Sequence, residues 1–227
     1  MKQKKRERGI LFDLDGVILD SEKASVEIFQ KVLSKFGIKI SFKEASKYYL
    51  GKRDIDAYSN FVFEKKMNCS PQFLSKEHNK IYNNKLPKFK EFLGVERILL
   101  LAKELSYKIA VVSGSSRKQI DSVMKRLGYK KFFDAVVSSE DVLIGKPSPE
   151  GYLKASERIK VLIENCIVLE DSETGILAGN NAGAYTIGVE IGNFSKQDLS
   201  KANLIVRNLN EISEEFLKEF PLTKQKP

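Results

Sequence analysis

The sequence predicts an α/β protein: a Rossmann-like parallel sheet with helices on both faces, plus an all-helical segment inserted after the first strand. Two observations lead to this fold class. From Gly94 onward, short apolar runs alternate with segments of helical periodicity. Residues 21–85 show helical patterns and no convincing strand. Because short, continuously apolar strands separated by helices are typical of parallel sheets covered on both faces, the alternation favours that architecture.

The first strand is expected at Ile10–Phe12, directly before two acidic residues. A helix is expected next, because apolar residues recur three and four positions apart and Gly37 follows them as a stop signal. Further along, Ser70-Pro71 is typical of an N-cap followed by proline in the first turn. The residues that define the first of these helices are Val26, Phe29, Leu33 and Phe36.

The remaining elements alternate along the chain. Helices are expected at 95–105, 117–127, 150–159 and 174–181, and strands at 109–112, 135–137, 166–169, 186–189 and 204–206. This divides the chain into an α/β core domain (1–20 and 86–227) and a helical cap domain (21–85), called the helical insert below. Since the insert follows the carboxyl end of the first strand, where such sheets bind ligands, it is placed to act as a lid.

Composition narrows the function classes. With 227 residues and 42% hydrophobic content, the chain can bury a substantial core. The net charge is +9, but residues 2–8 carry +4 of it and Lys224 with Lys226 another +2. Basic termini are more often solvated than bound to nucleic acid or lipid, so a nucleic-acid partner is disfavoured.

Targeting and redox signals point to the cytoplasm. Only Ile10, Leu11 and Phe12 separate the basic start from Asp13, whereas a signal peptide needs about 7–15 apolar residues. No apolar stretch is long enough for a membrane span. The two cysteines, Cys69 and Cys166, match no zinc or redox spacing and are expected to be reduced thiols, with Cys166 in the core.

The first strand ends in the most informative motif, Asp13-Leu-Asp15-Gly16. Strand alternation points the two carboxylates to the same side, and Gly16 lets the backbone turn out of the sheet. Two like charges this close favour a bound Mg²⁺, with one aspartate also able to act as a nucleophile. A strand end with two solvated acids is the alternative for this motif taken alone.

Three other strand ends carry groups suited to phosphate chemistry. Ser113-Gly114-Ser115-Ser116 opens a helix with hydroxyl and amide donors for an anion. Lys146 stands beside a proline and can neutralise acids and phosphate, and Glu170-Asp171-Ser172 forms a second acidic pair. Each motif alone is equally compatible with helix capping or an exposed charge. Their coincidence at the ends of one parallel sheet predicts an active site.

In their order along the chain and in their residues, these motifs resemble those of the haloacid dehalogenase-like superfamily of phosphotransferases. The resemblance covers nearly the full chain: Asp13 and Asp15 in the first motif, Ser113 in the second, Lys146 in the third and Glu170-Asp171 in the fourth. The helical insert is similar to the cap of the subgroup that holds phosphoglycolate phosphatase, small sugar-phosphate phosphatases and β-phosphoglucomutase.

The resemblance implies a role for each motif. Asp13 is the nucleophile that forms an aspartyl-phosphate, and Asp15 is the acid/base. Mg²⁺ binds Asp13, the Asp15 backbone carbonyl and Asp171, with Glu170 close by or joined through water. Ser113 and the Gly114 amide hold phosphoryl oxygens, with Ser115 beside them, and Lys146 offsets the negative charge. Around the Gly51-Lys52-Arg53 loop of the insert, Lys52 and Arg53 are candidate substrate contacts, as is Arg117, although solvated charges explain these residues equally well.

Within the family, Asp15 argues for phosphoryl transfer, because halide departs without a proton. The expected function is a Mg²⁺-dependent phosphatase of small phosphate monoesters. A β-phosphoglucomutase-like mutase stays open, although Ser25 stands where that pattern has histidine, and the single histidine, His78, is expected at the surface. A non-catalytic phosphate-binding or nucleic-acid-associated module is the less favoured alternative. The expected partner is a small phosphate ester, with no membrane, and the chain is expected to be a monomer or weak homodimer.

Overall fold

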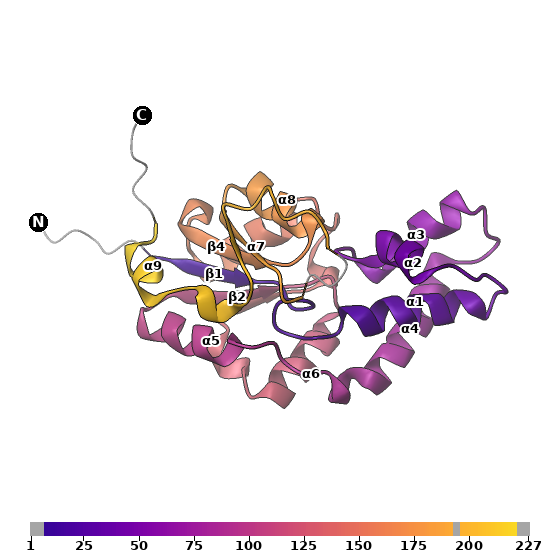
Figure 1. Cartoon of the computed structure of the whole chain (residues 1–227), viewed down its shortest axis with the longest axis horizontal. Helices are drawn as coiled ribbons and strands as arrows, with labels where there is room; N and C mark the ends of the chain where they lie inside the picture. The colour runs from indigo at the N-terminus through magenta and orange to yellow at the C-terminus, as the bar shows by residue number, and fades with distance from the viewer. Residues whose placement is uncertain (1–6, 193–195, 222–227) are drawn as a thin grey trace, which may run out of the picture.

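The computed structural model describes residues 7–192 and 196–221. Its described residues form one six-stranded parallel sheet in the order β3-β2-β1-β4-β5-β6 (Figure 1). This confirms the predicted fold class. The strands are β1 (Gly9–Phe12), β2 (Lys108–Val112), β3 (Ala135–Val137), β4 (Cys166–Glu170), β5 (Tyr185–Val189) and β6 (Leu204–Val206).

Strand β1 lies at the centre of the sheet, between β2 and β4. Phe12, its last residue, pairs with Val111 on one side and with Leu169 on the other. The chain order therefore reverses at β1, and ligands of open α/β sheets bind beyond the strands at such a reversal. The residues that follow β1, β2 and β4 are accordingly brought to the same edge.

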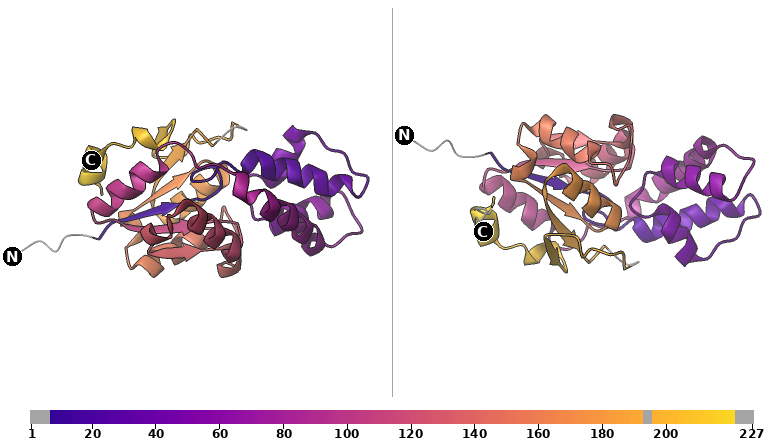
Figure 2. Two further views of the ribbon diagram at one scale, coloured as in Figure 1. Left: turned by 90° about the horizontal axis from the view of Figure 1, so that it is seen from below. Right: turned by 90° about the horizontal axis from the view of Figure 1, so that it is seen from above.

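Apolar side chains cover both faces of the sheet. Leu11, Ala110 and Val168 pack with Tyr152 and Ala178 from the helices on one face. Alternate residues of the same strands, such as Ile10 and Phe12, face the other side and join a larger core. Figure 2 shows the sheet between these helix layers. The helices of this part are α5 (Val95–Glu104), α6 (Arg117–Leu127), α7 (Glu150–Ile159), α8 (Glu173–Ala182) and α9 (Glu214–Glu219).

The helical insert forms a four-helix unit beside the carboxyl edge of the sheet (Figures 1 and 2). Its first helix buries Val26, Phe29 and Leu33 as the periodicity predicts, whereas Phe36 lies beyond the helix end and is 41% exposed. Ser70 accepts from the Phe73 amide and Pro71 begins the last helix, which confirms that start signal. The four helices are α1 (Glu22–Ser34), α2 (Phe42–Tyr49), α3 (Asp54–Glu64) and α4 (Pro71–Lys85).

Two chain segments join the insert to the sheet, and they run side by side. The Asp20 amide donates to the Lys90 carbonyl at 2.8 Å, and the Phe92 amide donates to the Ile18 carbonyl at 3.0 Å. Both connections are thus tied together by backbone hydrogen bonds. The division of the chain into two domains at residues 21 and 85, and the movement of one part as a lid, stay predictions.

The structure corrects two expectations about single residues. His78 is fully buried in the insert, not at the surface, because neighbouring tyrosines supply partners for both of its ring nitrogens. Arg8 is not part of a solvated tail: its guanidinium donates to the carbonyls of Leu105 and Leu217 and lies over the Tyr107 ring. The remaining basic residues of the termini lie in 1–6 and 222–227, which are outside the described residues.

Two further expectations concern burial and membrane spans. Cys166 is buried at the start of β4, as predicted for a core thiol, and burial raises its pKa to about 12. Among the helices in the described part of the chain, none has the length and apolar character needed to cross a membrane.

Candidate active site

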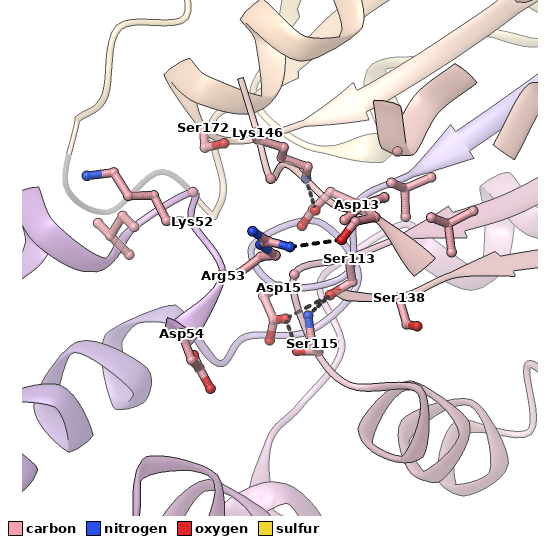
Figure 3. Close-up of a pocket in the computed structure, with 18 of the residues that line it drawn as sticks. Asp13, Asp15, Lys52, Arg53, Asp54, Ser113, Ser115, Ser138, Lys146 and Ser172 are labelled. Atoms are coloured by element: carbon pink, nitrogen blue, oxygen red, sulfur yellow. Dashed lines mark hydrogen bonds and ion pairs between the residues drawn. The ribbon is translucent and has the colours of Figure 1, made fainter. Parts of the chain in front are cut away.

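Two strand ends that are neighbours in the sheet, together with a loop, bring three charged groups into direct contact. Asp13 follows β1 and Glu170 ends β4. The ammonium of Lys146, from the loop before α7, donates to the carboxylate of Asp13 (Figure 3) and also to that of Glu170. Tyr152 of α7 also donates to Glu170, at 2.6 Å. All of these groups are buried or nearly so. The pairing is therefore a buried cluster of charges, and the expected role of Lys146 in offsetting the charge of acids and phosphate stays a prediction.

The carboxylate of Asp15 has quite different surroundings, because it faces hydroxyl groups. Ser115 donates to it at 3.0 Å, Ser113 lies at 3.5 Å, and Tyr82 of the insert donates at 2.8 Å. Ser21 donates to the same carboxylate, so that hydroxyl does not cap α1. Asp15 is therefore surrounded by neutral hydrogen-bonding groups, whereas Asp13 lies against a cation.

The loop after β2 is free to serve the site because other residues cap its helix. Ser116 and Gln119 form a capping box at the start of α6, so capping engages neither Ser113 nor Ser115. The Ser115 amide donates to the Ser113 hydroxyl at 3.0 Å, which fixes the turn. Similarly, Ser172 caps α8, which leaves Asp171 to face the pocket. The structure thus separates capping residues from candidate site residues.

Three carboxylates form a group that fits a hard divalent cation. Oxygens of Asp13, Glu170 and Asp171 lie within 4.8 Å of one another, and all three side chains are buried. One oxygen of Asp171 has no hydrogen-bond partner among the residues that the structure describes. A cradle of buried carboxylate oxygens with an unsatisfied member suits Mg²⁺. The carboxylate of Asp15 is turned to the hydroxyls, so its expected metal contact through the backbone carbonyl stays a prediction.

Two glycines make room for this acidic group. A Cβ on Gly16 would lie 2.0 Å from an Asp171 oxygen, and its φ of +91° also favours glycine. A Cβ on Gly175 would lie 1.9 Å from the carboxyl carbon of Glu170. Side chains at either position would displace the acids, so both glycines are part of the architecture of the site.

Glu22, at the first position of α1, is a functional candidate that the sequence reasoning missed. Its side chain is 8% exposed, lines the pocket, and has one oxygen without a partner. Burial, and then the charge of Asp171, raise its pKa well above the usual range. An acid in the first turn of a helix is common for dipole reasons alone, so the sequence offered no signal that separates Glu22 from an ordinary helix start.

The electrostatics of the pocket show an excess of negative charge. Burial raises the pKa of Asp13 well above its usual range, with Glu170 and Asp171 adding to the effect and Lys146 opposing it. Burial and Glu170 together raise the pKa of Asp171 to about 7. The pKa of Lys146 is raised, because Asp13 and Glu170 outweigh the opposing effect of burial. A divalent cation would relieve this repulsion between carboxylates.

The three basic candidates for substrate contact are engaged elsewhere. Lys52 lies at the pocket wall, but its ammonium extends away from Asp13 (Figure 3) and donates to the Lys47 carbonyl. Arg53 pairs with Asp56 and donates to the carbonyls of Val142 and Leu143, which links the insert to the loop that leads to Lys146.

Arg117 pairs with Asp121 on the surface of α6 and does not line the pocket formed by the described residues. Nothing in the described structure brings Arg117 to the pocket, and its expected contact with substrate stays a prediction. Gly114, in contrast, does line the pocket, as do Ser113 and Ser115. Further lining residues that the sequence reasoning missed include Tyr49, Asp54 and Tyr82 from the insert, and Gln119 and Tyr152 from the core part.

Comparisons with known proteins agree with this geometry. The family model described as haloacid dehalogenase-like hydrolase matches residues 10–189. A bifunctional riboflavin kinase/FMN phosphatase from Arabidopsis thaliana is 32% identical over 187 residues, which are 82% of this chain but 49% of that protein. The chain therefore spans about half the length of that relative.

Two further relatives match over most of their length. A phosphorylated carbohydrates phosphatase from Thermotoga maritima is 28% identical over 182 residues, 78% of this chain and 82% of that protein. The crystal structure of a β-phosphoglucomutase from Clostridium difficile superposes with a TM-score of 0.81 at 27% identity, and covers 94% of this chain and 96% of that one. With the family model matching well over half of its residues, this chain belongs to the haloacid dehalogenase-like hydrolase family.

Proposed function

We propose that this protein is a Mg²⁺-dependent phosphatase that hydrolyses small phosphate monoesters through an aspartyl-phosphate on Asp13. The observation that best supports the proposal is the different surroundings of two neighbouring carboxylates. Asp13 is bound by the Lys146 ammonium, and Asp15 is bound by hydroxyls. The Lys146 ammonium opposes the rise in the pKa of Asp13 that burial causes, and a bound Mg²⁺ would further favour the charged, nucleophilic form. Asp15, which faces hydroxyls instead of a cation, is the group that we propose to exchange a proton with the leaving oxygen.

These surroundings suit a reaction in two steps. First, an Asp13 oxygen bonds to phosphorus while the ester P–O bond breaks, and Asp15 gives its proton to the departing alcohol oxygen. Second, water attacks the phosphoryl group, the bond to Asp13 breaks, and Asp15 takes the proton from that water. Phosphate leaves and both carboxylates return to their starting states.

The other groups of the pocket position and neutralise charge. Asp13, Asp171, Glu170 and the Asp15 backbone carbonyl would hold Mg²⁺, which when bound supplies positive charge to the phosphoryl oxygens. The Ser113 hydroxyl and the Gly114 amide are placed to donate to the same oxygens. Lys146 offsets the negative charge that gathers when a phosphate joins the acids.

The relatives support phosphate esters as the substrate class. The names of two of them state FMN and phosphorylated carbohydrates as the compounds on which they act. Both compound classes are phosphate monoesters of hydroxyl-rich alcohols. We therefore propose a sugar phosphate or a related metabolite as the substrate.

The test compares Asp13→Asn and Asp15→Asn with an aryl phosphate in the presence of Mg²⁺. Loss of the nucleophile should lower kcat by about a thousandfold or more. An aryl oxide departs without a proton, so Asp15→Asn should instead accumulate phosphorylated enzyme, detected as a phosphoryl adduct in the intact mass. Asp20→Asn is the matched control, because Asp20 is exposed and lies outside the pocket. Retained turnover in Asp13→Asn would contradict the proposal.

A mutase is the second candidate, favoured by the superposition on a β-phosphoglucomutase. Against it, Ser25 is buried and lines the pocket at the position where the mutase pattern has histidine. A panel of phosphorylated sugars assayed for both released phosphate and isomerised product separates the two activities. Binding of phosphate esters without either product would favour a non-catalytic module.

A further inference from the structure

The helical insert contains a buried hydrogen-bonded chain that the proposed mechanism does not use. His78 of α4 is fully buried, with its Nδ1 atom 3.1 Å from the Tyr58 hydroxyl and its Nε2 atom 3.0 Å from the Tyr49 hydroxyl. The Tyr49 hydroxyl in turn donates to a carboxylate oxygen of Asp54. This hydrogen-bonded chain therefore runs from the core of the insert to Asp54, which lines the pocket.

The direction of every hydrogen bond in this chain follows from the number of donors. Tyr49 has one hydroxyl proton, which it gives to Asp54, so its oxygen accepts from His78 Nε2–H. The Nδ1 atom of a neutral imidazole is then an acceptor, and it receives the proton of the Tyr58 hydroxyl. Burial lowers the pKa of His78, which is consistent with the neutral ring. One tautomer satisfies all four groups, and the chain ends on an acceptor.

The same aromatic residues tie Asp54 to the catalytic side of the pocket. The His78 ring stacks between Tyr49 and Tyr82, with ring centroids 4.9 Å and 6.4 Å away. The Tyr82 hydroxyl donates to Asp15. A stack of three rings therefore spans from Asp54 to Asp15, and the labelled side chains of these two acids lie on the side of the pocket away from Lys146 (Figure 3).

The neighbouring cations do not neutralise Asp54 in the described structure. Arg53 forms its ion pair with Asp56, and Lys52 is turned to the Lys47 carbonyl. The insert therefore offers the pocket an acceptor that no ion pair among the described residues engages, beside an Arg53 guanidinium that is already paired with Asp56. A hydroxyl of the substrate would be bound by such a group, whereas a second phosphate would be repelled.

We propose that the chain of Tyr58, His78 and Tyr49 holds Asp54 as an acceptor for a hydroxyl group on the alcohol part of the substrate. This rests on the proposed phosphatase function, in which Asp15 contacts the leaving oxygen at the other end of the ring stack. The substrates favoured by this arrangement are monophosphates of polyols or sugars, and those disfavoured are bisphosphates and simple alkyl phosphates. Asp54 determines specificity, and Tyr49 and His78 are positioning residues.

The test measures kcat/KM for two matched pairs of esters: glycerol 3-phosphate against propyl phosphate, and sorbitol 6-phosphate against hexyl phosphate. For at least one pair, the polyol ester should exceed the alkyl ester about tenfold or more, the range expected for one hydrogen bond to a charged group. Asp54→Ala should bring that ratio close to one. Asp54→Asn, which keeps the shape and an acceptor oxygen, should lower the ratio several-fold and raise relative activity on sorbitol 1,6-bisphosphate.

Two tyrosine variants distinguish positioning from a general loss of structure. Tyr49→Phe removes the hydroxyl that holds Asp54 and should lower the polyol-to-alkyl ratio mainly through KM. Tyr48→Phe is the matched control, because Tyr48 packs against Phe61 outside the pocket, and it should leave the ratio unchanged. Melting temperatures of all variants verify folding, and Asp54→Asn carries the test if the alanine variant does not fold.

The outcomes separate this inference from the proposed function. Hydrolysis of all esters with a ratio that does not depend on Asp54 would overturn the inference and leave the phosphatase intact. An equal fall of the ratio in Tyr49→Phe and Tyr48→Phe would also overturn it. Absence of hydrolysis for every ester would overturn the proposed function itself.

Discussion

The pocket has two walls that are built in different ways. The core wall consists of three acids at strand ends, Asp13, Glu170 and Asp171, and of Lys146 from the loop before α7. The insert wall consists of a ring stack that ends on Asp54. Backbone pairing of parallel strands sets the spacing of the core wall, whereas side-chain contacts between helices set that of the insert wall. In the function proposed above, the core wall carries the chemistry and the insert wall selects the substrate.

The largest expected effect is on the core wall. Lys146→Met leaves Asp13 and Glu170 buried without their cation, and breaking a buried charge pair in this way costs about 3–5 kcal/mol of unfolding free energy. Urea denaturation of metal-free protein at neutral pH measures the loss. Lys154→Met is the control, because its pair with Glu150 lies near the surface and should contribute little. Equal stability of the two variants would show that the core wall does not depend on this charge pairing.

A pH-dependent effect of intermediate size is expected at Asp171. Its pKa is raised from 3.8 to about 7, so the folded state holds its proton more tightly than the unfolded state. Ionisation then costs stability as pH rises from about 4 to about 7, and the full cost is present above that range. In metal-free buffer, Asp171→Asn should match the original protein at pH 4 and exceed its stability by up to about 4 kcal/mol at pH 8.

The control for this prediction is Asp141, whose replacement is expected to change the stability in the opposite direction. The pKa of Asp141 is lowered, chiefly by its hydrogen bond with Arg158, so that carboxylate stabilises the fold once it is ionised. The stability of Asp141→Asn should therefore fall below that of the original protein as pH rises to the range in which an unfolded aspartate ionises, and should stay below it at higher pH. A destabilised Asp171→Asn protein at pH 8 would show that its carboxylate is stabilised without metal.

The smallest effect is expected on the insert wall. His78→Phe strands the buried Tyr58 hydroxyl and should cost about 2 kcal/mol of unfolding free energy. The double variant with Tyr58→Phe removes the stranded group and should recover about 1 kcal/mol. Chemical denaturation of the two single variants and the double variant measures the coupling. Additive losses would mean that the two side chains do not depend on each other.

Much of the core wall could be predicted from the sequence because Asp13, Glu170 and Asp171 lie at or directly after the ends of short apolar strands. Asp13 and Glu170 fall on strands that pair residue by residue, so the register of β1 and β4 brings them together. The sequence did not indicate that Ser116 caps the helix while Ser113 and Ser115 remain candidate site residues. All three hydroxyls are suited to a helix start.

The insert wall could not be predicted in the same way. Tyr49, Asp54 and His78 meet through three different helices, and no local spacing relates them. Their order in the sequence indicated helices, but the interhelical contacts that bury His78 depend on how those helices pack. The same holds for Glu22, whose position looks like any acidic first turn.

By itself, the sequence determined the parallel sheet, the place of the insert and the family to which the chain belongs. Those features follow from local patterns: apolar runs, turn residues and chemical groups at strand ends. The tertiary structure alone decided which carboxylates lie against Lys146, which hydroxyls surround Asp15, and that Asp54 rather than Arg53 offers the pocket an unpaired charge. The physical reason is that burial and partner choice are properties of packed surfaces, which bring distant residues within a few ångströms of each other.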